Sequence, residues 1–283
     1  MLLGTARVLM RLRDRLPCPV KLLFQPAEEK GGGAKHIIDA GALDERTGGC
    51  KVNRVLGLHG WATLDLGKMS TRPGVMMAAT DLFSITIRGK GGHGAAPHLT
   101  RDPIVAAAHV VVALQTVVSR SVNPVDPAVL TVGVIQGGQT ENVIPETVTL
   151  RGTIRSVETR VASLIHQRLQ EIAQATAQAF GCSAEVSMYE GYPPVVNEAS
   201  LAAQTIQTLS QELGAENLQP MNTPVMGAED FAYYGQLVPS CFIYLGLRPP
   251  GHEAYPAVHN PYFDFNDAAM PMGIRALCAL ALG

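Results

Sequence analysis

The sequence predicts an α/β fold, in which a mostly parallel sheet flanked by helices carries an inserted ferredoxin-like α+β domain. The first observation is that short apolar stretches alternate with helix-length segments whose apolar residues recur every three or four positions. The second is that the middle of the chain changes to the order strand, helix, strand, strand, helix, strand, which is that of a ferredoxin-like unit.

The first part of the chain alternates helix and strand. Apolar residues between Leu2 and Leu16 recur at steps of three and four, so an amphipathic helix is expected there, ended by Pro17. Val20 to Phe24 is expected to form a short buried strand. A helix near Ala34–Ala40 then leads to a second strand, Arg54–Leu58, which runs into His59. This alternation is typical of a sheet with parallel strands.

The inserted domain is expected over residues 79–193, and residues 1–78 and 194–283 together form the larger α/β domain. Within the insert, strands are predicted at 81–88, 128–136, 147–155 and 183–190, and helices at 103–119 and 160–180. The Gly-Tyr-Pro-Pro stretch at 191–194 ends it. A helix near 198–213, a strand at 241–247 and a final helix after Asn266 complete the first domain.

Composition excludes several classes of protein. The 283 residues carry a formal net charge of -2, so there is no overall electrostatic attraction to nucleic acid or to an anionic membrane. The five cysteines form no C-x-x-C pair, which indicates buried thiols in a reducing compartment. No apolar run approaches membrane-spanning length. We therefore expect a cytoplasmic protein with neither nucleic acid nor membrane as a partner.

Carboxylates and histidines follow the predicted strands. Glu28 and Glu29 come after the first strand, His59 ends the second, and His259 lies in a loop. Ligands gather at the carboxyl ends of parallel strands, and this donor set suits zinc, manganese or cobalt, with one carboxylate left as general base. The alternative is a solvated Glu-Glu turn with incidental histidines.

The glycine-rich stretch Gly89–Gly94 formally matches G-x-G-x-x-G after a strand. A dinucleotide site would need a helix opening directly and an acidic residue about twenty positions on, and both are missing. An exposed His93 on this turn suits polarising a substrate oxygen better. The sequence has no G-x-S-x-G elbow, and no cysteine has a paired histidine context.

A second glycine-rich connection spans Gly137–Pro145 and contains Asn142. Together with Arg155 at the end of the next strand, it could bind a planar anionic group such as a carboxylate. The alternative is an ordinary hairpin with a surface arginine.

Seven motifs, in order along the chain, resemble one family: the metal-dependent amidohydrolases and carboxypeptidases that include hippurate hydrolases, aminoacylases and indoleacetyl-amino-acid hydrolases. The motifs are FQPAEE (24–29), GLH (57–59), GKGGHGAAPH (89–98), GGQTENVIP (137–145), GTIR (152–155), GAEDF (227–231) and VHNPYFDF (258–265). The resemblance covers essentially the whole chain.

The resemblance implies two divalent metal ions and hydrolysis of the amide bond of an N-acyl amino acid. It implies that Glu28 is the general base, that Glu29, His59 and His259 are metal ligands, and that His93 stabilises the oxyanion. Asn142, Arg155 and Gly227 match positions associated with substrate binding. The inserted domain matches the lid and dimerisation domain, so a homodimer is expected.

One departure from the family pattern affects these expectations. Relatives carry a Cys-Gly-His-Asp type segment upstream of the helix that begins this chain, and it supplies two further ligands. None of the five cysteines lies in such a context. We therefore expect fewer than two bound metal ions and weak activity. A dipeptidase or carboxypeptidase on the same scaffold, or a non-catalytic dimeric binding protein, are the alternatives.

Overall fold

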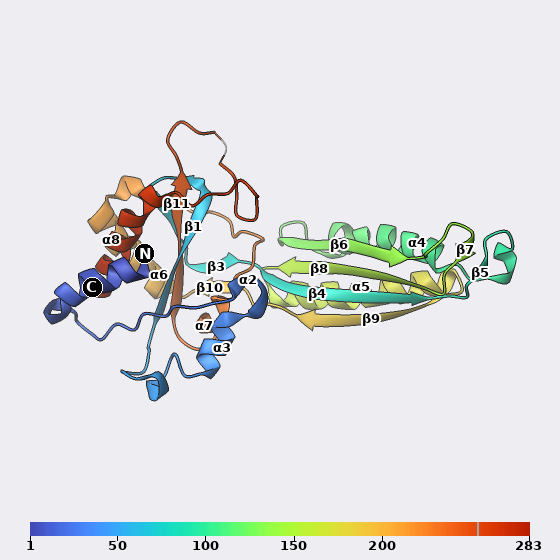
Figure 1. Ribbon diagram of the computed structural model, residues 1–283, viewed down its shortest axis with the longest axis horizontal. Coiled ribbons are helices and arrows are strands. Elements are labelled where there is room, and N and C mark those ends of the chain that lie inside the picture. Colours follow the sequence, from blue (N-terminus) through green and yellow to red (C-terminus); the bar gives the residue numbers. More distant parts are fainter. Residues whose placement is uncertain (254) are drawn as a thin grey trace. The chain divides into compact units, whose positions relative to one another are not determined.

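The computed structural model describes residues 1–253 and 255–283, and it divides them into two compact units (Figure 1). Unit 1 comprises residues 1–76, 195–224 and 229–283, and unit 2 comprises residues 77–194 and 225–228. The sequence interpretation assigned segment 225–228 to the first domain. It groups with unit 2 because the amide of Ala78 donates to the carbonyls of Val225 and Gly227.

Two long parallel strands form the centre of unit 1. β1 (Val55–Asp65) pairs with β11 (Ser240–Arg248) in parallel, and β2 (Met69–Ser70) pairs with β11 in the antiparallel direction. The order β1-β11-β2 leaves β1 at an edge of this sheet. A second, two-stranded sheet consists of β3 (Gly74–Met77) and β10 (Val195–Asn197). The fold is therefore mixed α/β.

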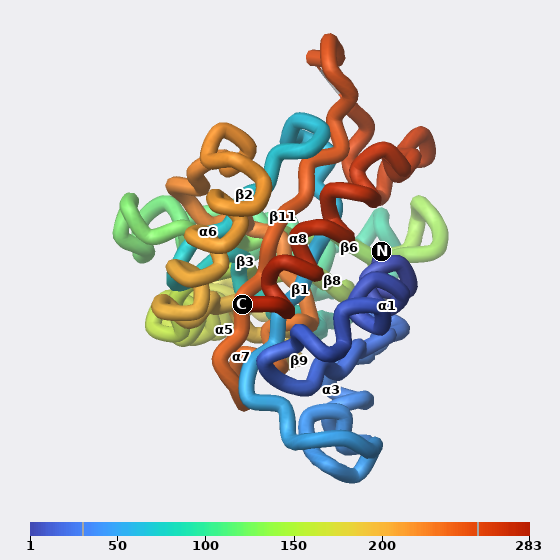
Figure 2. The backbone as a smooth tube through the Cα atoms, turned by 90° about the vertical axis from the view of Figure 1, so that its left-hand side faces the viewer, coloured from blue at the N-terminus to red at the C-terminus, as the bar shows by residue number. Residues whose placement is uncertain are grey.

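Helices cover one face of the β1–β11 pair. Figure 2 shows α6 and α8 in front of β11, with α1 beside α8. Leu209 and Ala276 of these helices join Ile243 and Leu245 of β11 in one buried cluster. Every second side chain of β11 points to this face, because side chains alternate along a strand. The helices of unit 1 are α1 (Leu2–Arg11), α2 (Glu28–Gly31), α3 (Gly33–Asp39), α6 (Ala199–Leu213), α7 (Ala232–Gly235) and α8 (Met270–Leu282).

The opposite face of the pair carries aromatic and imidazole rings. His59 of β1 lies opposite Tyr244 of β11, and Gly57 lies opposite Phe242. A Cβ on Gly57 would lie 2.6 Å from the rings of both Phe231 and Phe242. Glycine at this position therefore lets the Phe231 ring pack directly on the sheet.

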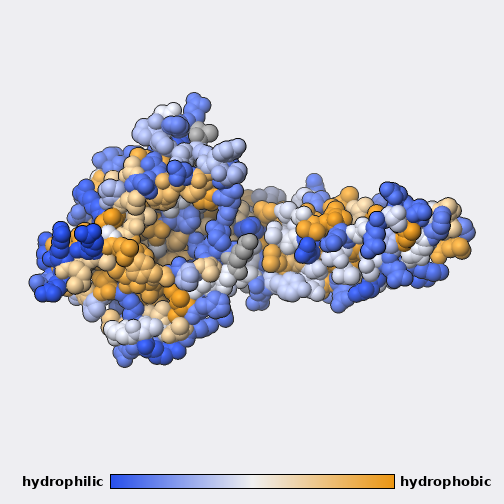
Figure 3. Space-filling model, in the orientation of Figure 1, coloured by the Kyte–Doolittle hydropathy of each residue, from blue (hydrophilic) through white to orange (hydrophobic). Residues whose placement is uncertain are grey.

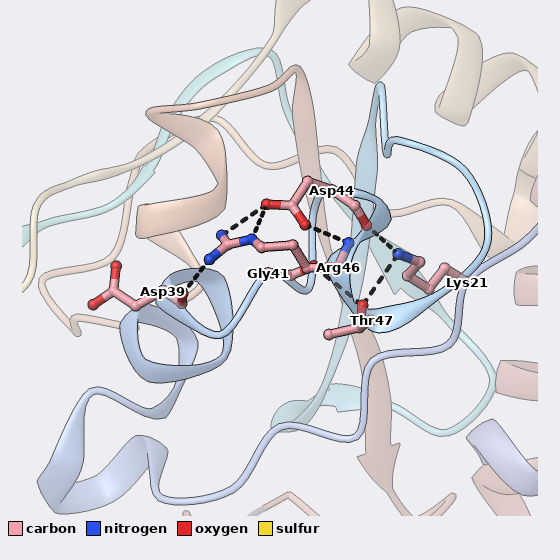
Figure 4. A network of polar contacts seen from close by, with 6 residues as sticks. All are labelled: Lys21, Asp39, Gly41, Asp44, Arg46 and Thr47. Carbon is pink, nitrogen blue, oxygen red and sulfur yellow. Dashed lines mark hydrogen bonds and ion pairs between the residues drawn. The ribbon is translucent and has the colours of Figure 1, made fainter.

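The predicted buried strand at Val20–Phe24 is wrong. The segment has no strand assignment, and Val20 and Phe24 are 39% and 58% exposed. A strand needs a partner with unpaired peptide groups, and in the described part of the chain no strand pairs with this segment. Lys21 holds it instead, donating to the carbonyl of Asp44 (2.7 Å) and to Thr47 Oγ1 (3.3 Å) (Figure 4).

Unit 2 contains a four-stranded antiparallel sheet in the order β6-β8-β4-β9. Buried residues such as Ile85, Leu114 and Ile165 join the sheet to helices α4 and α5 in one core. The elements are β4 (Ala79–Arg88), β5 (Gly92–His93), α4 (Pro103–Thr116), β6 (Ala128–Gly137), β7 (Val143–Ile144), β8 (Thr147–Ser156), α5 (Thr159–Ala179) and β9 (Ser183–Glu190).

Helix α4 continues through a π-helical turn at Val117–Ser121. The whole stretch Pro103–Ser121 is long and apolar enough to cross a membrane by length and composition alone, so the expectation that no run approaches this length was wrong. One side of the helix is part of the unit 2 core, whereas Ile104 and Val112 on the other side are 47% and 69% exposed. The helix therefore has apolar residues both on the side that packs in the core and on the side that is exposed.

We expect Asn197→Ala to destabilise the protein by about 3 kcal/mol, because several buried hydrogen bonds depend on one side chain. The amide of Asn197 is 1% exposed, donates to Thr71 Oγ1 and to the carbonyls of Arg72 and Phe242, and accepts from the amide of Phe242. Denaturant unfolding measures the change. The exposed Asn123→Ala is the control, and equal effects of the two variants would contradict this role for Asn197.

Candidate metal site

A strained turn presents the two glutamates. Ala27 has a left-handed backbone (φ 59°), directly before the short helix α2 that begins at Glu28. Such a conformation costs a non-glycine residue about 1–2 kcal/mol and is typical of functional sites. A Cβ on Gly33 would lie 1.6 Å from the Pro26 carbonyl oxygen, so the chain can fold back this tightly only with glycine there.

A fully buried carboxylate holds this turn in place. Asp230 Oδ1 accepts a hydrogen bond from Gln25 Nε2 (2.6 Å), and Asp230 Oδ2 accepts one from the amide of Ala34 (2.9 Å). The hydroxyl of Tyr234 donates to Gln25 Oε1 (2.8 Å). Both ends of the glutamate turn are therefore tied to the segment that contains Asp230.

Three carboxylates converge beside the turn. Oxygen atoms of Glu28, Glu229 and Asp230 lie within 4.8 Å of one another, and Glu229 and Asp230 are buried. Burial, followed by repulsion from Glu29 and Asp230, raises the pKa of Glu28. Burial, followed by the charge of Glu28, raises the pKa of Glu229 to about 8. Such a concentration of negative charge favours binding of a cation.

His59 is prepared to act as a ligand. Its Nδ1 lies 2.7 Å from the carbonyl oxygen of Gly60, which can only accept, so Nδ1 carries the proton and Nε2 has a free lone pair. Burial is the main cause that lowers the pKa of His59, which keeps the ring neutral. A neutral imidazole whose other nitrogen is fixed by a hydrogen bond is the usual form of a metal-binding histidine.

His259 and Glu29 form the exposed side of the site. His259 Nε2 and Glu29 Oε2 lie 3.5 Å apart, and His259 has a left-handed backbone (φ 68°). Two atoms bound to one tetrahedral zinc ion at about 2.0–2.1 Å lie about 3.3 Å apart. The separation therefore fits two ligands of one ion. Electrostatic interactions link His59 to both residues, so the structure brings Glu28, Glu29, His59 and His259 together.

The remaining predicted residues lie in unit 2, at two different ends of its sheet. His93 pairs with Val143 where β5 meets β7, and the amide of Gly94 donates to the carbonyl of Asn142 (2.8 Å). His93 Nδ1 accepts from the amide of Ala95 (3.0 Å), which leaves Nε2 as the donor. His93 and Asn142 therefore lie next to each other on one connection.

Arg155 and Gly227 lie at the opposite end. Arg155 Nη1 donates to the carbonyl of Met226 (3.0 Å), and Arg155 pairs with Thr80 at the start of β4. The strand β4 ends eight residues later, at Arg88, so this end is about 26 Å from the His93 end. Asn142 and Arg155 of one chain therefore do not reach the same small carboxylate, because a ten-residue strand separates them.

Sequence reasoning missed Glu229 and Asp230 as members of the site. The motif GAEDF contains both residues, but the resemblance assigns a role only to its Gly227. Two acidic residues are rare in a buried position unless they are paired or bind a cation. Their place beside Phe231, in a stretch that packs against the sheet, was the signal that could have identified them.

Carboxylates and imidazoles gathered beside the middle of β1 form a candidate metal site, with donor groups of the kind that hold divalent ions in hydrolases. Residues 1–283 match the Peptidase family M20/M25/M40, and the chain belongs to that family of amidohydrolases and peptidases. It is 39% identical to the IAA-amino acid hydrolase ILR1-like 4 of Arabidopsis thaliana, over 99% of this chain and 63% of that protein. It is 38% identical to the N-acetyl-L-cysteine deacetylase of Bacillus subtilis (strain 168), over 95% of this chain and 61% of that protein.

The chain thus spans less than two thirds of these two relatives. A solved structure from Bacillus subtilis, the YXEP protein, described as a dinuclear metal binding peptidase from the M20 family, superimposes with a TM-score of 0.79. It is 26% identical, and the match covers 99% of this chain and 69% of that one. The Thermostable carboxypeptidase 2 of Saccharolobus solfataricus (strain ATCC 35092 / DSM 1617 / JCM 11322 / P2) is 33% identical, over 100% of this chain and 70% of that protein.

We expect the metal-free protein to lose stability as the pH rises from about 4.5 to about 8. Over this range Glu229 keeps its proton in the folded protein, whereas the unfolded chain releases it. The contribution of Glu229 to the free energy of unfolding is therefore complete below the pKa of the unfolded state and is lost as the pH rises through the pKa of the folded state. The slope is at most about 1.4 kcal/mol per pH unit. Denaturant unfolding at several pH values measures it.

The variant Glu229→Gln should flatten this dependence, because glutamine does not titrate. The exposed Glu45→Gln is the matched control and should leave the slope unchanged. If Glu229→Gln kept the wild-type slope, the buried carboxyl would not be the group responsible.

Proposed function

We propose that the protein hydrolyses the amide bond of N-acyl amino acids with a divalent metal cofactor, in the manner of hippurate hydrolases and aminoacylases. The observation that carries the proposal is the convergence of Glu28, whose pKa is raised, with the Glu29–His259 pair and a neutral His59. A small-molecule N-acyl amino acid or peptide is the substrate, and the expected location is the cytoplasm.

Each candidate site residue of unit 1 has a role in this proposal. Glu29, His59 and His259 would hold the ion, and their donor atoms suit manganese, zinc and cobalt. A bound ion supplies Lewis acidity toward water and the acyl oxygen. Glu28 accepts the proton of the attacking water and donates it to the leaving amine. Its raised pKa suits both transfers, because a general acid–base group works best with a pKa near the working pH.

The residues of unit 2 complete the site in the proposal. His93 donates from Nε2 to the oxygen that becomes negative during attack. Asn142 and Arg155 bind the substrate carboxylate, and Gly227 also contacts the substrate. Because about 26 Å separates these two ends in one unit, they would act on one small substrate only if two copies of the chain each contributed one end.

Two alternatives use the same scaffold. A dipeptidase or carboxypeptidase is favoured by similarity to the thermostable carboxypeptidase of Saccharolobus solfataricus. A non-catalytic dimeric binding protein would keep the lid without turnover. Comparing hydrolysis of benzoylglycine and acetyl-methionine with that of a free-amine dipeptide distinguishes the proposed activity from a dipeptidase or carboxypeptidase. The metal content of the purified chain distinguishes it from a non-catalytic binding protein.

We expect Glu28→Gln to abolish turnover while the bound metal remains, because an amide cannot accept the proton of water. We expect Glu29→Gln to lower the metal content instead. The two variants are matched controls for each other, because the residues are adjacent and the changes are identical. Elemental analysis and hydrolysis rates test both, and equal metal loss in the two variants would refute this division of roles.

The chain offers three ligands for an ion in this proposal, so we expect fewer than two tightly bound ions per 283-residue chain. Three side chains and a water are a common set for one catalytic zinc ion. Little hydrolysis is expected even with added manganese. Two stoichiometric ions and brisk hydrolysis would contradict this expectation and show that other residues complete the site.

We further propose that unit 2 forms a two-fold dimer through strand β6 and helix α4. β6 lies at the edge of its sheet, Ile135 on it is 63% exposed, and Val112 of α4 is 69% exposed. An unpaired edge with apolar neighbours is a natural pairing surface. Light scattering at micromolar concentration should give the dimer mass, and Val112→Lys should shift it toward the monomer. A monomeric wild type would contradict the proposal.

A further inference from the structure

Two stacked aromatic rings lie beside His59 on the face of the β1–β11 pair that carries the candidate site. The ring centroids of Trp61 and Tyr244 are 4.1 Å apart, and the two planes are inclined by only 19°. Trp61 follows His59 by two residues on β1, so both side chains point to the same face of the sheet. Trp61 is the single tryptophan of the chain, and the proposed catalysis gives it no role.

The stacked pair is close to the groups of the candidate site. The ring of Trp61 approaches that of His59 edge-on, with 6.2 Å between the centroids and 65° between the planes. The ring of Tyr244 lies 6.4 Å from that of His59. Burial, followed by the charge of Glu229, raises the pKa of Tyr244, so this ring also lies near the buried carboxylates. A substrate held beside His59 would therefore be next to the stacked pair.

The stack leaves part of the indole open. Tyr244 is 2% exposed and covers one face of the indole, whereas Trp61 is half-buried. The residue opposite Trp61 on β11 is Gly246, so no side chain of that strand lies directly across from the indole. The exposed surface of Trp61 therefore belongs to its edges and to the face that is turned away from Tyr244.

An indole surface selects its ligands differently from the other apolar surfaces of unit 1. Hydrophobic residues gather over much of the face of unit 1 seen in Figure 3. Such surface attracts an apolar group of any shape, because the hydrophobic effect is non-directional. An aromatic ring in addition favours a second flat ring, stacked or edge-on, and this preference is worth about three- to tenfold in affinity beyond the area buried.

We propose that Trp61 determines the acyl specificity of the site, and that its open face binds a planar aromatic acyl group in preference to a saturated group of the same size. The proposal rests on the proposed function, since it takes the acyl carbonyl to be attacked beside His59. The ring of a benzoyl group is bonded directly to the carbonyl carbon. It therefore stays close to His59 and within reach of the indole.

A purely structural role for Trp61 predicts a different result. If the stack with Tyr244 only held His59 in position, the shape of the acyl group would not matter to Trp61. Burial alone would then favour a saturated ring at least as much as a flat one, because the saturated ring has the larger apolar surface. The order of affinity of a flat and a saturated acyl group therefore distinguishes the two roles.

Benzoylglycine and cyclohexanecarbonylglycine are matched probes, because they share the glycine carboxylate and the number of ring carbons and differ in planarity. Each is titrated into the chain with added manganese while the emission of Trp61 is recorded, so binding and not turnover is measured. We expect benzoylglycine to change the emission saturably and to bind about three- to tenfold more tightly than its saturated analogue. Equal affinities, or no change in emission with benzoylglycine, would overturn the proposal. Failure of the proposed function would be seen separately, as absent hydrolysis of both probes.

Variants locate the preference at one side chain. Trp61→Phe keeps a flat ring and should keep a preference for benzoylglycine, whereas Trp61→Leu should bring the ratio of the two affinities to about one. Calorimetric titration measures both variants, since neither contains tryptophan. Tyr189→Leu removes a 56% exposed ring from β9 of unit 2 and is the control that should keep the wild-type ratio. A wild-type ratio in Trp61→Leu would refute the role of Trp61, and the emission titration of the wild type decides the question even if this variant does not fold.

Discussion

The buried carboxylate of Asp230 is the constraint on which the candidate site depends. It is 0% exposed, and its two oxygens accept from Gln25 and from the amide of Ala34. These groups belong to segments 205 and 196 residues away in the sequence. A buried hydrogen bond to a charged group contributes about 1.5–3 kcal/mol, so one side chain fixes both ends of the turn that presents Glu28 and Glu29.

The β1–β11 pair carries a candidate site residue of unit 1, His59, on one face and the apolar core on the other. Side chains alternate along a strand, so Leu58 and Leu245 pack toward the helices while His59 and Tyr244 lie on the other face. Burial beside these rings keeps His59 neutral, and the same burial raises the pKa of Glu229. The low-polarity environment thus favours the uncharged form of both groups, the unprotonated imidazole of His59 and the protonated carboxyl of Glu229.

Periodic segments were predictable because their own pattern determines them. The helices at 159–179 and 199–213 and the strands β4, β6, β8 and β9 lie where the spacing of apolar residues predicts them, whereas the two-residue strands β5 and β7 were not predicted. The segment Val20–Phe24 was not, because strand formation depends on a partner that the local sequence does not contain. In the site, Glu29, His59 and His259 could be chosen by residue type, whereas the roles of Asp230 and Glu229 follow from burial, which appears only in three dimensions.

The insertion of unit 2 between parts of unit 1 has a consequence for how the chain folds. The partners β1 and β11 flank the whole of residues 77–194 in sequence, so their pairing closes a very long loop. The contacts of unit 2 join nearer segments, such as β8 and β4, and form at a smaller loss of chain entropy. Once unit 2 has folded, its two ends are fixed near each other, since the start of β4 pairs with the end of β9. Folding of the inserted unit therefore shortens the loop that the pairing of β1 with β11 has to close, so the insert assists the assembly of the sheet that carries His59.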